Sequence, residues 1–156
     1  MFKGQAACIA LGLAACSPEP AMSDEDMALL RESAPGISER CLEIARSDGV
    51  EVIPQDVRDC FAMEQPRRYS GYWLTDFETS IYCEERGSDG SCLLDGTLVW
   101  LSFDVDTTPR NVPDGVYRIE FTGRRTAAAG SFGHWGSSDY ELVVEDLLTL
   151  ENANSP

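Results

Sequence analysis

The sequence predicts an α+β protein that is mostly β, in which short N-terminal helices precede a small antiparallel barrel or a strongly coiled sheet. Up to about residue 66, apolar residues recur at helical spacing between capping and stop signals. From residue 72 on, apolar and polar residues alternate over four long segments that polar turns separate. Four such strands cannot share one flat sheet without exposing an apolar face, so we expect the sheet to curl or close.

Three short helices are expected in the first half of the chain. Ser23 can cap the first helix, because its hydroxyl can accept from a backbone N–H and acidic residues fill the turn that follows. A second serine can cap the next helix, and a proline opens the third. The expected helices run from Ser23 to Pro35 and Gly36, from Ser38 to Asp48 and Gly49, and from Pro54 to Pro66.

Strict alternation predicts four long strands in the second half. The first covers residues 72–83 and places Trp73, Phe77 and Cys83 on one face. A polar turn follows it, and one or two short strands are expected near Cys92 and Thr126. The remaining long strands are expected over residues 99–105, 117–121 and 140–150.

The last strand contains a change of phase. Leu142 and Val144 share one face of it, whereas Leu147 falls on the other face, which predicts a β-bulge. The spacing of the strands resembles that of a five-stranded oligonucleotide/oligosaccharide-binding barrel. The resemblance implies that the strands close around one hydrophobic core, with the helices packed against them.

The beginning of the chain has the layout of a secretory signal. Lys3 supplies a positive charge, and the apolar run after it is much shorter than the roughly 20 residues of a membrane-spanning helix. Residues 13–16 read Leu-Ala-Ala-Cys, which resembles the lipobox of bacterial lipoproteins. The resemblance implies that residues 1–15 are removed and that a lipid on Cys16 binds the protein to a membrane, facing the periplasm. Because Ser17 follows instead of an aspartate, the resemblance favours the outer membrane.

One domain is expected after this signal. Residues 16–22 would form a lipidated tether, residues 23–66 a helical segment, and residues 67–152 a β domain packed with it as one unit. The chain carries 12 basic and 27 acidic residues, which give a net charge of −15. This charge repels polyanions, and no basic stripe with interleaved aromatic residues is present, so we expect no nucleic-acid partner.

Four cysteines remain once Cys8 is assigned to the signal and Cys16 to the lipid. An even number of cysteines in an oxidising compartment predicts two disulfides, and three pairings are possible. We favour Cys41–Cys60 and Cys83–Cys92, because each of these pairs lies within one helical or hairpin unit. A zinc site is disfavoured, since the chain has no Cys-x-x-Cys pair and its one histidine is distant. We expect no metal and no cofactor.

The stretch before the last strand is the most distinctive in the sequence. Gly-Arg-Arg at residues 123–125 leads to Gly-Ser-Phe-Gly-His at residues 130–134, and Glu-Leu-Val-Val opens the final strand. Residues 117–147 thereby resemble a pattern of uncharacterised secreted bacterial proteins, in which Gly-Arg-Arg precedes a Gly-x-x-Gly-His loop and a Glu-Leu-x-Val strand. The resemblance implies one homologous domain type and carries no function.

Two interpretations of this loop are open. In the first, Trp135 stacks on a ligand ring beside His134, and Arg124 and Arg125 hold an anion. In the second, Trp135 plugs one end of the barrel, His134 hydrogen-bonds a carbonyl, and the arginines pair with the abundant acids. We favour the second interpretation, because loops with several glycines often need a strict backbone geometry for folding.

Enzyme signatures are weak. A Ser-His-Asp triad would have to use His134, and no serine lies in a Gly-x-Ser-x-Gly context. Asp76 and Glu78 lie on the polar face of a predicted strand, where solvated acids are expected. A calcium loop is disfavoured because Thr108 and Pro109 replace a ligand and a glycine. The acids that such a loop would have used are Asp104, Asp106 and Asp114.

The sequence therefore favours a membrane-anchored periplasmic lipoprotein that is not an enzyme and that serves as a binding or structural domain of the cell envelope. An envelope protein or a glycan would be its partner. The alternative is a hydrolase or lyase that acts on envelope polysaccharide through His134 and nearby carboxylates. The two hypotheses differ on whether His134 faces a pocket that also holds a carboxylate within hydrogen-bonding reach.

Overall fold

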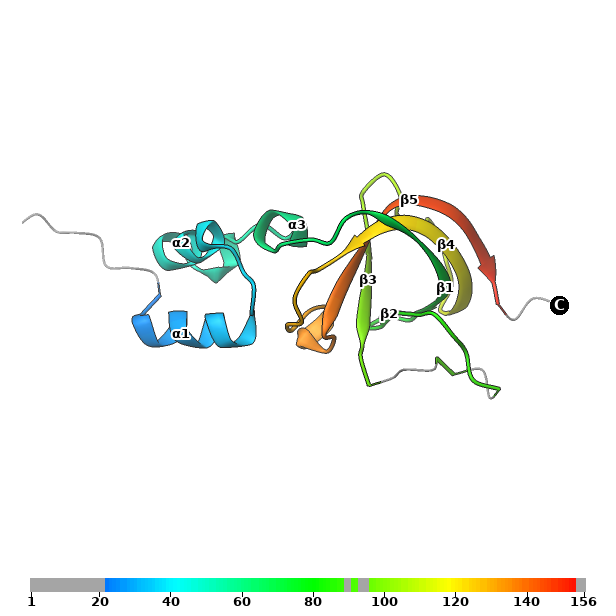
Figure 1. The fold of residues 1–156 in the computed structure, drawn as a ribbon, viewed down its shortest axis with the longest axis horizontal. Coiled ribbons are helices and arrows are strands. Elements are labelled where there is room, and N and C mark those ends of the chain that lie inside the picture. Colours follow the sequence, from blue (N-terminus) through cyan, green and yellow to red (C-terminus); the bar gives the residue numbers. More distant parts are fainter. Residues whose placement is uncertain (1–21, 89–90, 93–95, 154–156) are drawn as a thin grey trace, which may run out of the picture.

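The computed structural model describes residues 22–88, 91–92 and 96–153, so Cys16 and the predicted signal peptide lie outside the described residues. Its five strands close into a barrel in the order β1-β2-β3-β5-β4 (Figure 1). Neighbouring strands are antiparallel except β3 and β5, which run parallel. The strands are β1 (Arg67–Thr75), β2 (Ser80–Cys83), β3 (Val99–Phe103), β4 (Gly115–Arg125) and β5 (Tyr140–Asn152). The predicted fold class, short helices followed by a small barrel, is confirmed.

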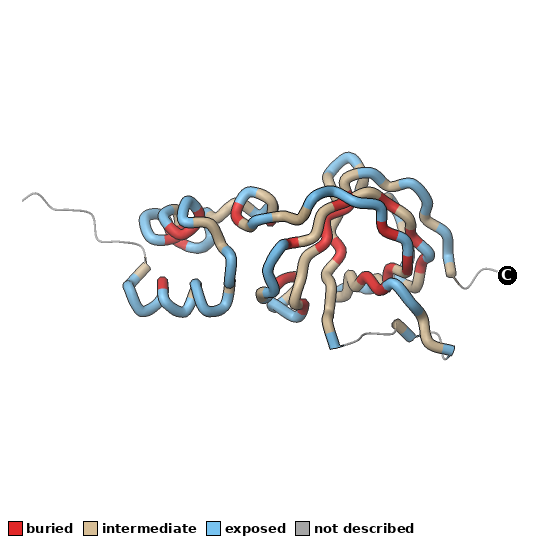
Figure 2. The backbone as a smooth tube through the Cα atoms, in the orientation of Figure 1, coloured by how far each residue is buried: buried red, intermediate tan, exposed pale blue. Residues whose placement is uncertain are grey.

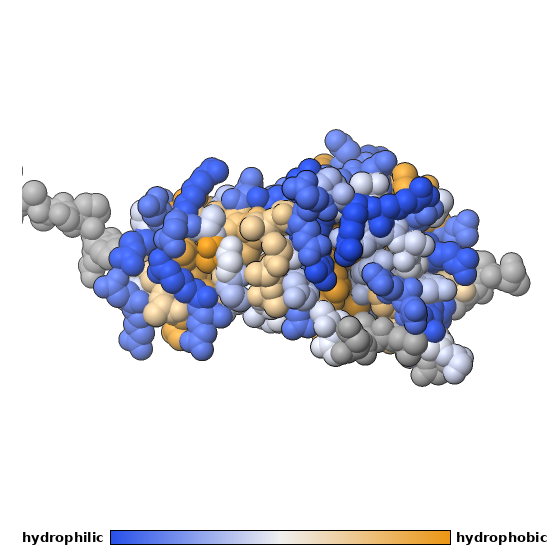
Figure 3. Space-filling view, viewed as in Figure 1, coloured by the Kyte–Doolittle hydropathy of each residue, from blue (hydrophilic) through white to orange (hydrophobic). Residues whose placement is uncertain are grey.

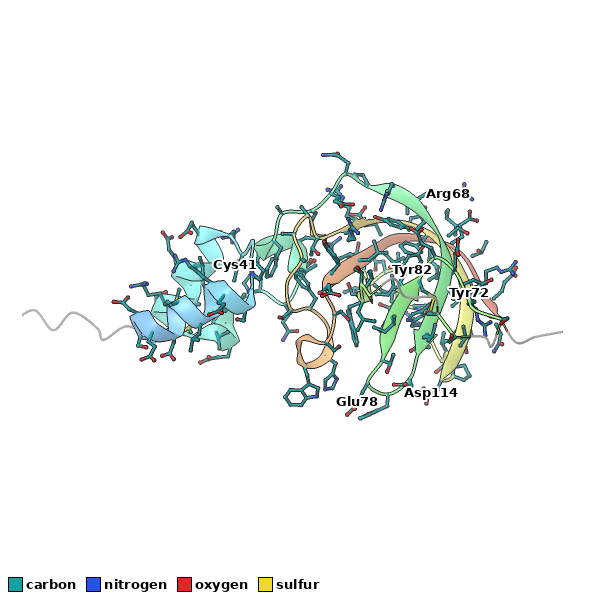
Figure 4. All side chains as sticks on the ribbon, turned by 60° about the horizontal axis from the view of Figure 1, so that its bottom comes forward. Cys41, Arg68, Tyr72, Glu78, Tyr82 and Asp114 are labelled. Carbon is teal, nitrogen blue, oxygen red and sulfur yellow. A yellow bond between two sulfur atoms is a disulfide. The ribbon has the colours of Figure 1, made fainter. Side chains whose placement is uncertain are left out.

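Alternate residues of each strand fill the inside of the barrel. Figure 4 shows Tyr82 inside the ring of strands, with Arg68 and Tyr72 outside it. Figure 2 shows that most buried residues lie in the strands. Successive side chains of a strand point to opposite faces, so every second one enters the core. The buried core residues are Tyr69, Trp73, Tyr82, Leu101, Tyr117, Ile119, Phe121, Leu142 and Val144.

The change of phase in the last strand is a real irregularity. The register between β4 and β5 shifts between Glu120 and Phe121 and again between Thr122 and Gly123. These shifts return Leu147 to the core side, where it packs against the buried cluster. The predicted bulge is confirmed, and it lets the long strand β5 bend around the barrel.

The strand predicted over residues 72–83 is wrong as one element. The chain reverses at residues 76–79, where the backbone N–H of Asp76 donates to the carbonyl of Thr79 over 3.0 Å and the Asp76 carboxylate accepts from the N–H of Glu78 over 2.9 Å. Phe77, expected on the buried face, lies in this turn and is 92% exposed. Alternation continues through the turn by chance, so the pattern alone could not reveal the reversal.

The helical segment agrees with the capping signals at two of three helices. Ser23 caps α1 (Asp24–Ser33) in a capping box with Asp26, and Ser38 caps α2 (Glu39–Asp48). A short 3-10 turn, η1 (Val50–Val52), follows. The third helix was predicted too long: α3 (Val57–Cys60) begins after Asp56, whose carboxylate accepts from the N–H of Arg58, and not at Pro54. The chain then extends to reach the barrel.

Both predicted disulfides are present. Cys41–Cys60 joins α2 to α3 with the Cα atoms 5.6 Å apart, and Cys83–Cys92 joins the end of β2 to the loop after it with the Cα atoms 5.7 Å apart. The first bond is fully buried and the second begins at a buried cysteine. The local pairing is therefore confirmed.

Helices α1 and α2 lie beyond one end of the barrel, with α3 between them and the strands (Figure 1). They have a small core of their own, made of Met27, Leu42 and Ala45. Figure 3 shows mildly apolar atoms gathered between these helices and the barrel, on a face that is otherwise mostly hydrophilic. Within the described residues, no helix combines the length and the apolar character needed to cross a membrane.

Candidate functional site

The glycine-rich loop between β4 and β5 is a hydrogen-bonded hairpin. Phe132 and Ser138 exchange two backbone hydrogen bonds of 2.8 and 3.0 Å, and the N–H of Gly130 donates to the carbonyl of Asp139 over 2.8 Å. A 3-10 turn, η2 (His134–Gly136), closes the tip. The backbone hydrogen bonds of the two arms thus place residues 133–137 at the tip of the hairpin.

Two contacts attach this hairpin to the outside of the barrel. Phe132 is 5% exposed and packs with Val57 and Val143, and its ring meets the edge of Phe61 at a centroid distance of 5.1 Å. Gly133 has a φ of +70° and lies so close to Trp100 that an added Cβ would be 2.4 Å from the indole. Glycine is needed here both for the backbone conformation and for the close approach.

Trp135 does not plug the barrel. Its side chain is 91% exposed, and its backbone has a φ of +57°, in the left-handed region that non-glycine residues rarely occupy. The ring of His134 lies 5.2 Å away, centroid to centroid. The favoured interpretation is wrong for Trp135, because Phe132 takes the buried position on the outside of the barrel and the strands' own side chains fill the inside.

The two arginines lie on opposite faces of β4. Arg124 points outward and pairs with Glu145 over 2.9 Å. Arg125 points inward, pairs with Glu64 over 2.6 Å and lies over the ring of Tyr140 at 4.4 Å. Adjacent strand residues always face opposite ways, so these arginines cannot form one anion clamp. Both pair with acids, as predicted, and neither of them joins the tip of the loop.

An apolar row runs across the outside of three strands. The register places Leu74 of β1 beside Ile81 of β2, and Ile81 beside Trp100 of β3. All three side chains are only partly buried. The turn with exposed Phe77 joins β1 and β2 at one end of this row, and the hairpin that carries Trp135 covers Trp100 at the other. Sequence reasoning missed Trp100, whose outward phase between Val99 and Leu101 was the available signal.

Beside Trp100 the outer face becomes charged. A pocket of about 350 Å³ contains Glu141, Ser102 and a cluster around Arg58. Arg58 donates to Asp104 and to Asp56, and its side-chain hydrogen bond holds the pKa of Asp56 below its usual value. Burial raises the pKa of Glu141, and a hydrogen bond with Ser102 partly opposes this. The acid next to the apolar row is thus poorly solvated.

The raised pKa of Glu141 makes its charge unfavourable for folding. The unfolded carboxyl loses its proton first, so the free energy of unfolding should fall as the pH rises from about 4.5 through the folded pKa. Glu141→Gln should remove this loss, and its gain in Tm over the wild type should be larger at about pH 7 than at about pH 4. Glu151→Gln, at an exposed acid of the same strand, is the control for the loss of one surface charge. An equal gain for Glu141→Gln at both pH values would contradict the prediction.

Two of the acids considered in the sequence, Asp76 and Asp104, have hydrogen-bond or ion-pair partners within the protein. The N–H groups of Glu78 and Thr79 hold the pKa of the Asp76 carboxyl below its usual value in the β1–β2 turn. Asp104 is taken by Arg58. His134 lines neither the pocket around Arg58 nor the cavity lined by Tyr69 and Tyr82. In that same part of the chain, no group of three or more histidines, cysteines or acids is arranged to hold a metal ion.

Comparisons of this chain with protein-family models, with curated proteins and with solved structures find no match.

Proposed function

We propose that this protein is a non-enzymatic binding module of the bacterial cell envelope, anchored by a lipid on Cys16, and that it holds a glycan with Trp135 and the apolar row. The observation that carries the proposal is the near-complete exposure of an indole on a loop whose two arms are joined by backbone hydrogen bonds. The left-handed conformation of a non-glycine residue costs on the order of 1–3 kcal/mol. Because the Trp135 indole is exposed, no hydrophobic burial of this side chain offsets that cost. A partner that covers Trp135 accounts for both features.

Charge and shape favour a glycan over other partners. Pyranose rings have apolar C–H faces that stack on aromatic rings, and an exposed aromatic residue held by a hairpin is already arranged for this contact. The net charge of −15 opposes polyanions. The apolar row lies across β2 and β3, between the β1–β2 turn and the β4–β5 loop. Oligosaccharide-binding barrels of this architecture hold their ligands on the same face.

The envelope location rests on the lipobox resemblance and on the disulfides. Residues 13–16 resemble the signal for a lipid on Cys16, and such a lipid would keep the barrel near the membrane surface. Two disulfides support an oxidising compartment such as the periplasm. In this proposal the helices serve as a spacer between the anchor and the binding face, and the outer membrane is the favoured site.

The test is Trp135→Ala with chito-oligosaccharides and isolated peptidoglycan as probes. Because the indole is exposed, the free energy of unfolding should stay within about 0.5 kcal/mol of wild type. Loss of a stacking platform worth about 1–3 kcal/mol should weaken glycan binding by roughly 5-fold to 150-fold. Calorimetry would measure the oligosaccharide and co-sedimentation the peptidoglycan.

Val105→Ala is the control, since Val105 is also apolar, is 94% exposed and lies outside the apolar row. It should leave both stability and glycan binding unchanged. If the wild-type protein binds neither probe, or if Trp135→Ala binds both as the wild type does, the glycan proposal is wrong.

A further inference from the structure

A second cavity opens at the end of the barrel where β1 and β3 begin, on the inside of the strands. Its volume is about 560 Å³, within the range of pockets that hold small molecules. Buried Tyr69, Tyr82 and Leu142 form its floor, and partly buried Val99 and Tyr140 extend it. Burial raises the pKa of the Tyr82 hydroxyl, which donates to the carbonyl of Ser70 over 3.0 Å. The floor is therefore apolar and poorly solvated.

Two polar groups in the wall of this cavity have no hydrogen bond of normal geometry. The Nε of Arg125 is buried and makes no hydrogen bond of normal geometry among the described residues. The buried hydroxyl of Tyr69, in a residue 5% exposed, makes none of normal geometry either, but it interacts with the Arg67 guanidinium and raises the pKa of that group. An unsatisfied buried polar group costs about 1–3 kcal/mol. Both groups can donate, so an acceptor such as a carboxylate suits either of them.

The side chain of Arg67 covers the Tyr69 ring in this structure. Its guanidinium lies 4.7 Å from the ring centroid, is about half exposed, and reaches Glu64 only over 3.9 Å. An ion pair this long and exposed contributes little, so Arg67 can move aside when a ligand enters. The Arg125 side chain is held more firmly, by Glu64 at 2.6 Å and by the Tyr140 ring. The cavity thus combines a fixed cation inside with a movable one at the rim.

The rim also carries negative charge. Glu84 and Glu85, at the end of β2, line the opening and are exposed. A purely anionic ligand would be repelled there, whereas a ligand with a separate cationic group would be attracted. The required ligand has a carboxylate for Arg125 and Tyr69, an apolar body for the floor, and an ammonium group for the rim.

We propose that this cavity binds an amino acid or a short peptide through its free carboxylate and amino groups. The carboxylate accepts from the Nε of Arg125 and the hydroxyl of Tyr69, an apolar side chain rests on Tyr82 and Leu142, and the ammonium group faces Glu84 and Glu85. The site uses inward-facing residues and is separate from the apolar row on the outside, so it does not rest on the proposed glycan binding.

Leucine and glycyl-leucine are the probes, and NMR titration of the protein in non-reducing buffer is the measurement. Saturable binding by leucine alone indicates a free amino acid, whereas tighter binding of glycyl-leucine indicates a peptide. Glycyl-leucinamide lacks the carboxylate and should bind at least about tenfold more weakly than glycyl-leucine. The proposal is overturned if neither probe binds at concentrations up to about 10 mM, which is ten times a millimolar Kd. It is also overturned if glycyl-leucinamide binds as well as glycyl-leucine.

Tyr69→Phe removes only the hydroxyl and should weaken the better probe by about tenfold, because a hydrogen bond to a charged group is lost. Loss of an unsatisfied hydroxyl should leave Tm equal to or above that of the wild type, which shows that the variant folds. Tyr72→Phe, on the outer face of the same strand, is the control and should leave binding unchanged. Unaltered affinity of Tyr69→Phe would show that the hydroxyl does not contact the ligand and would overturn the assigned carboxylate site.

Discussion

Replacing Phe132 with alanine is expected to lower the free energy of unfolding by about 3–5 kcal/mol, as measured by urea denaturation. Phe132 is 5% exposed and fills the space between Val57 of α3 and Val143 of β5, with its ring against Phe61. Alanine would leave a cavity where the helical segment, the hairpin and the barrel meet. The hairpin would lose its anchor, so glycan binding by Trp135 should weaken as well, although Phe132 faces away from the ligand.

Trp135→Ala provides the contrast, because it removes a larger ring three residues along the same loop but from an exposed position. Its stability should stay within about 0.5 kcal/mol of wild type. If Trp135→Ala were as destabilising as Phe132→Ala, the indole would be buried in solution and the description of the loop would be wrong.

Removing the Cys41–Cys60 disulfide with the double variant Cys41→Ala and Cys60→Ala should cost about 3 kcal/mol in the chain-entropy model. The core between α1 and α2 contains only Met27, Leu42 and Ala45 as buried residues. This small core depends on the disulfide, which joins α2 to α3 and so to the barrel. We expect α1 and α2 to open locally while the strands stay folded, seen as fast amide exchange in residues 24–48 alone.

The double variant Cys83→Ala and Cys92→Ala is the control. Its bond closes a shorter loop, with a sequence separation of 9 instead of 19, at the opposite side of the barrel. Exchange in α1 and α2 should remain slow in this variant, and only the loop after β2 should become less protected. Uniform loss of protection over the whole chain in the first variant would show that helices and barrel unfold as one unit.

The two proposed sites lie on opposite sides of the barrel wall, the cavity on the inside and the apolar row on the outside. Period-two alternation sends Tyr69 and Tyr82 inward to the cavity, and Leu74 and Ile81 outward to the apolar row. A ligand in one site therefore touches none of the side chains that form the other. Trp135→Ala and Tyr69→Phe should accordingly affect glycan and amino-acid binding independently.

Several features of this protein follow from the sequence because the interactions behind them are local. Ser23 and Ser38 cap their helices through contacts three residues along the chain. The disulfides join cysteines 19 and 9 residues apart, and alternation identified the inward faces of three strands. The phase change before Leu147 indicated the bulge. Together these signals determined the fold class and the core residues of three strands, whereas Tyr69 lies before the first strand as predicted from residue 72.

The sites depended on contacts between residues far apart in the chain, which a one-dimensional pattern does not contain. Gly133 meets Trp100, and Phe132 meets Val57, so the loop turns its other aromatic residue, Trp135, toward solvent. From the sequence, either ring could have been the buried one. The cavity likewise exists because closure of the barrel brings the starts of β1, β3 and β5 to the ends of β2 and β4. Sequence alone determined the fold class and the approximate position of most strands and helices. Only the tertiary structure decided where the strand predicted over residues 72–83 reverses and which side chains are left exposed or without a hydrogen bond, because burial is a property of the assembled chain.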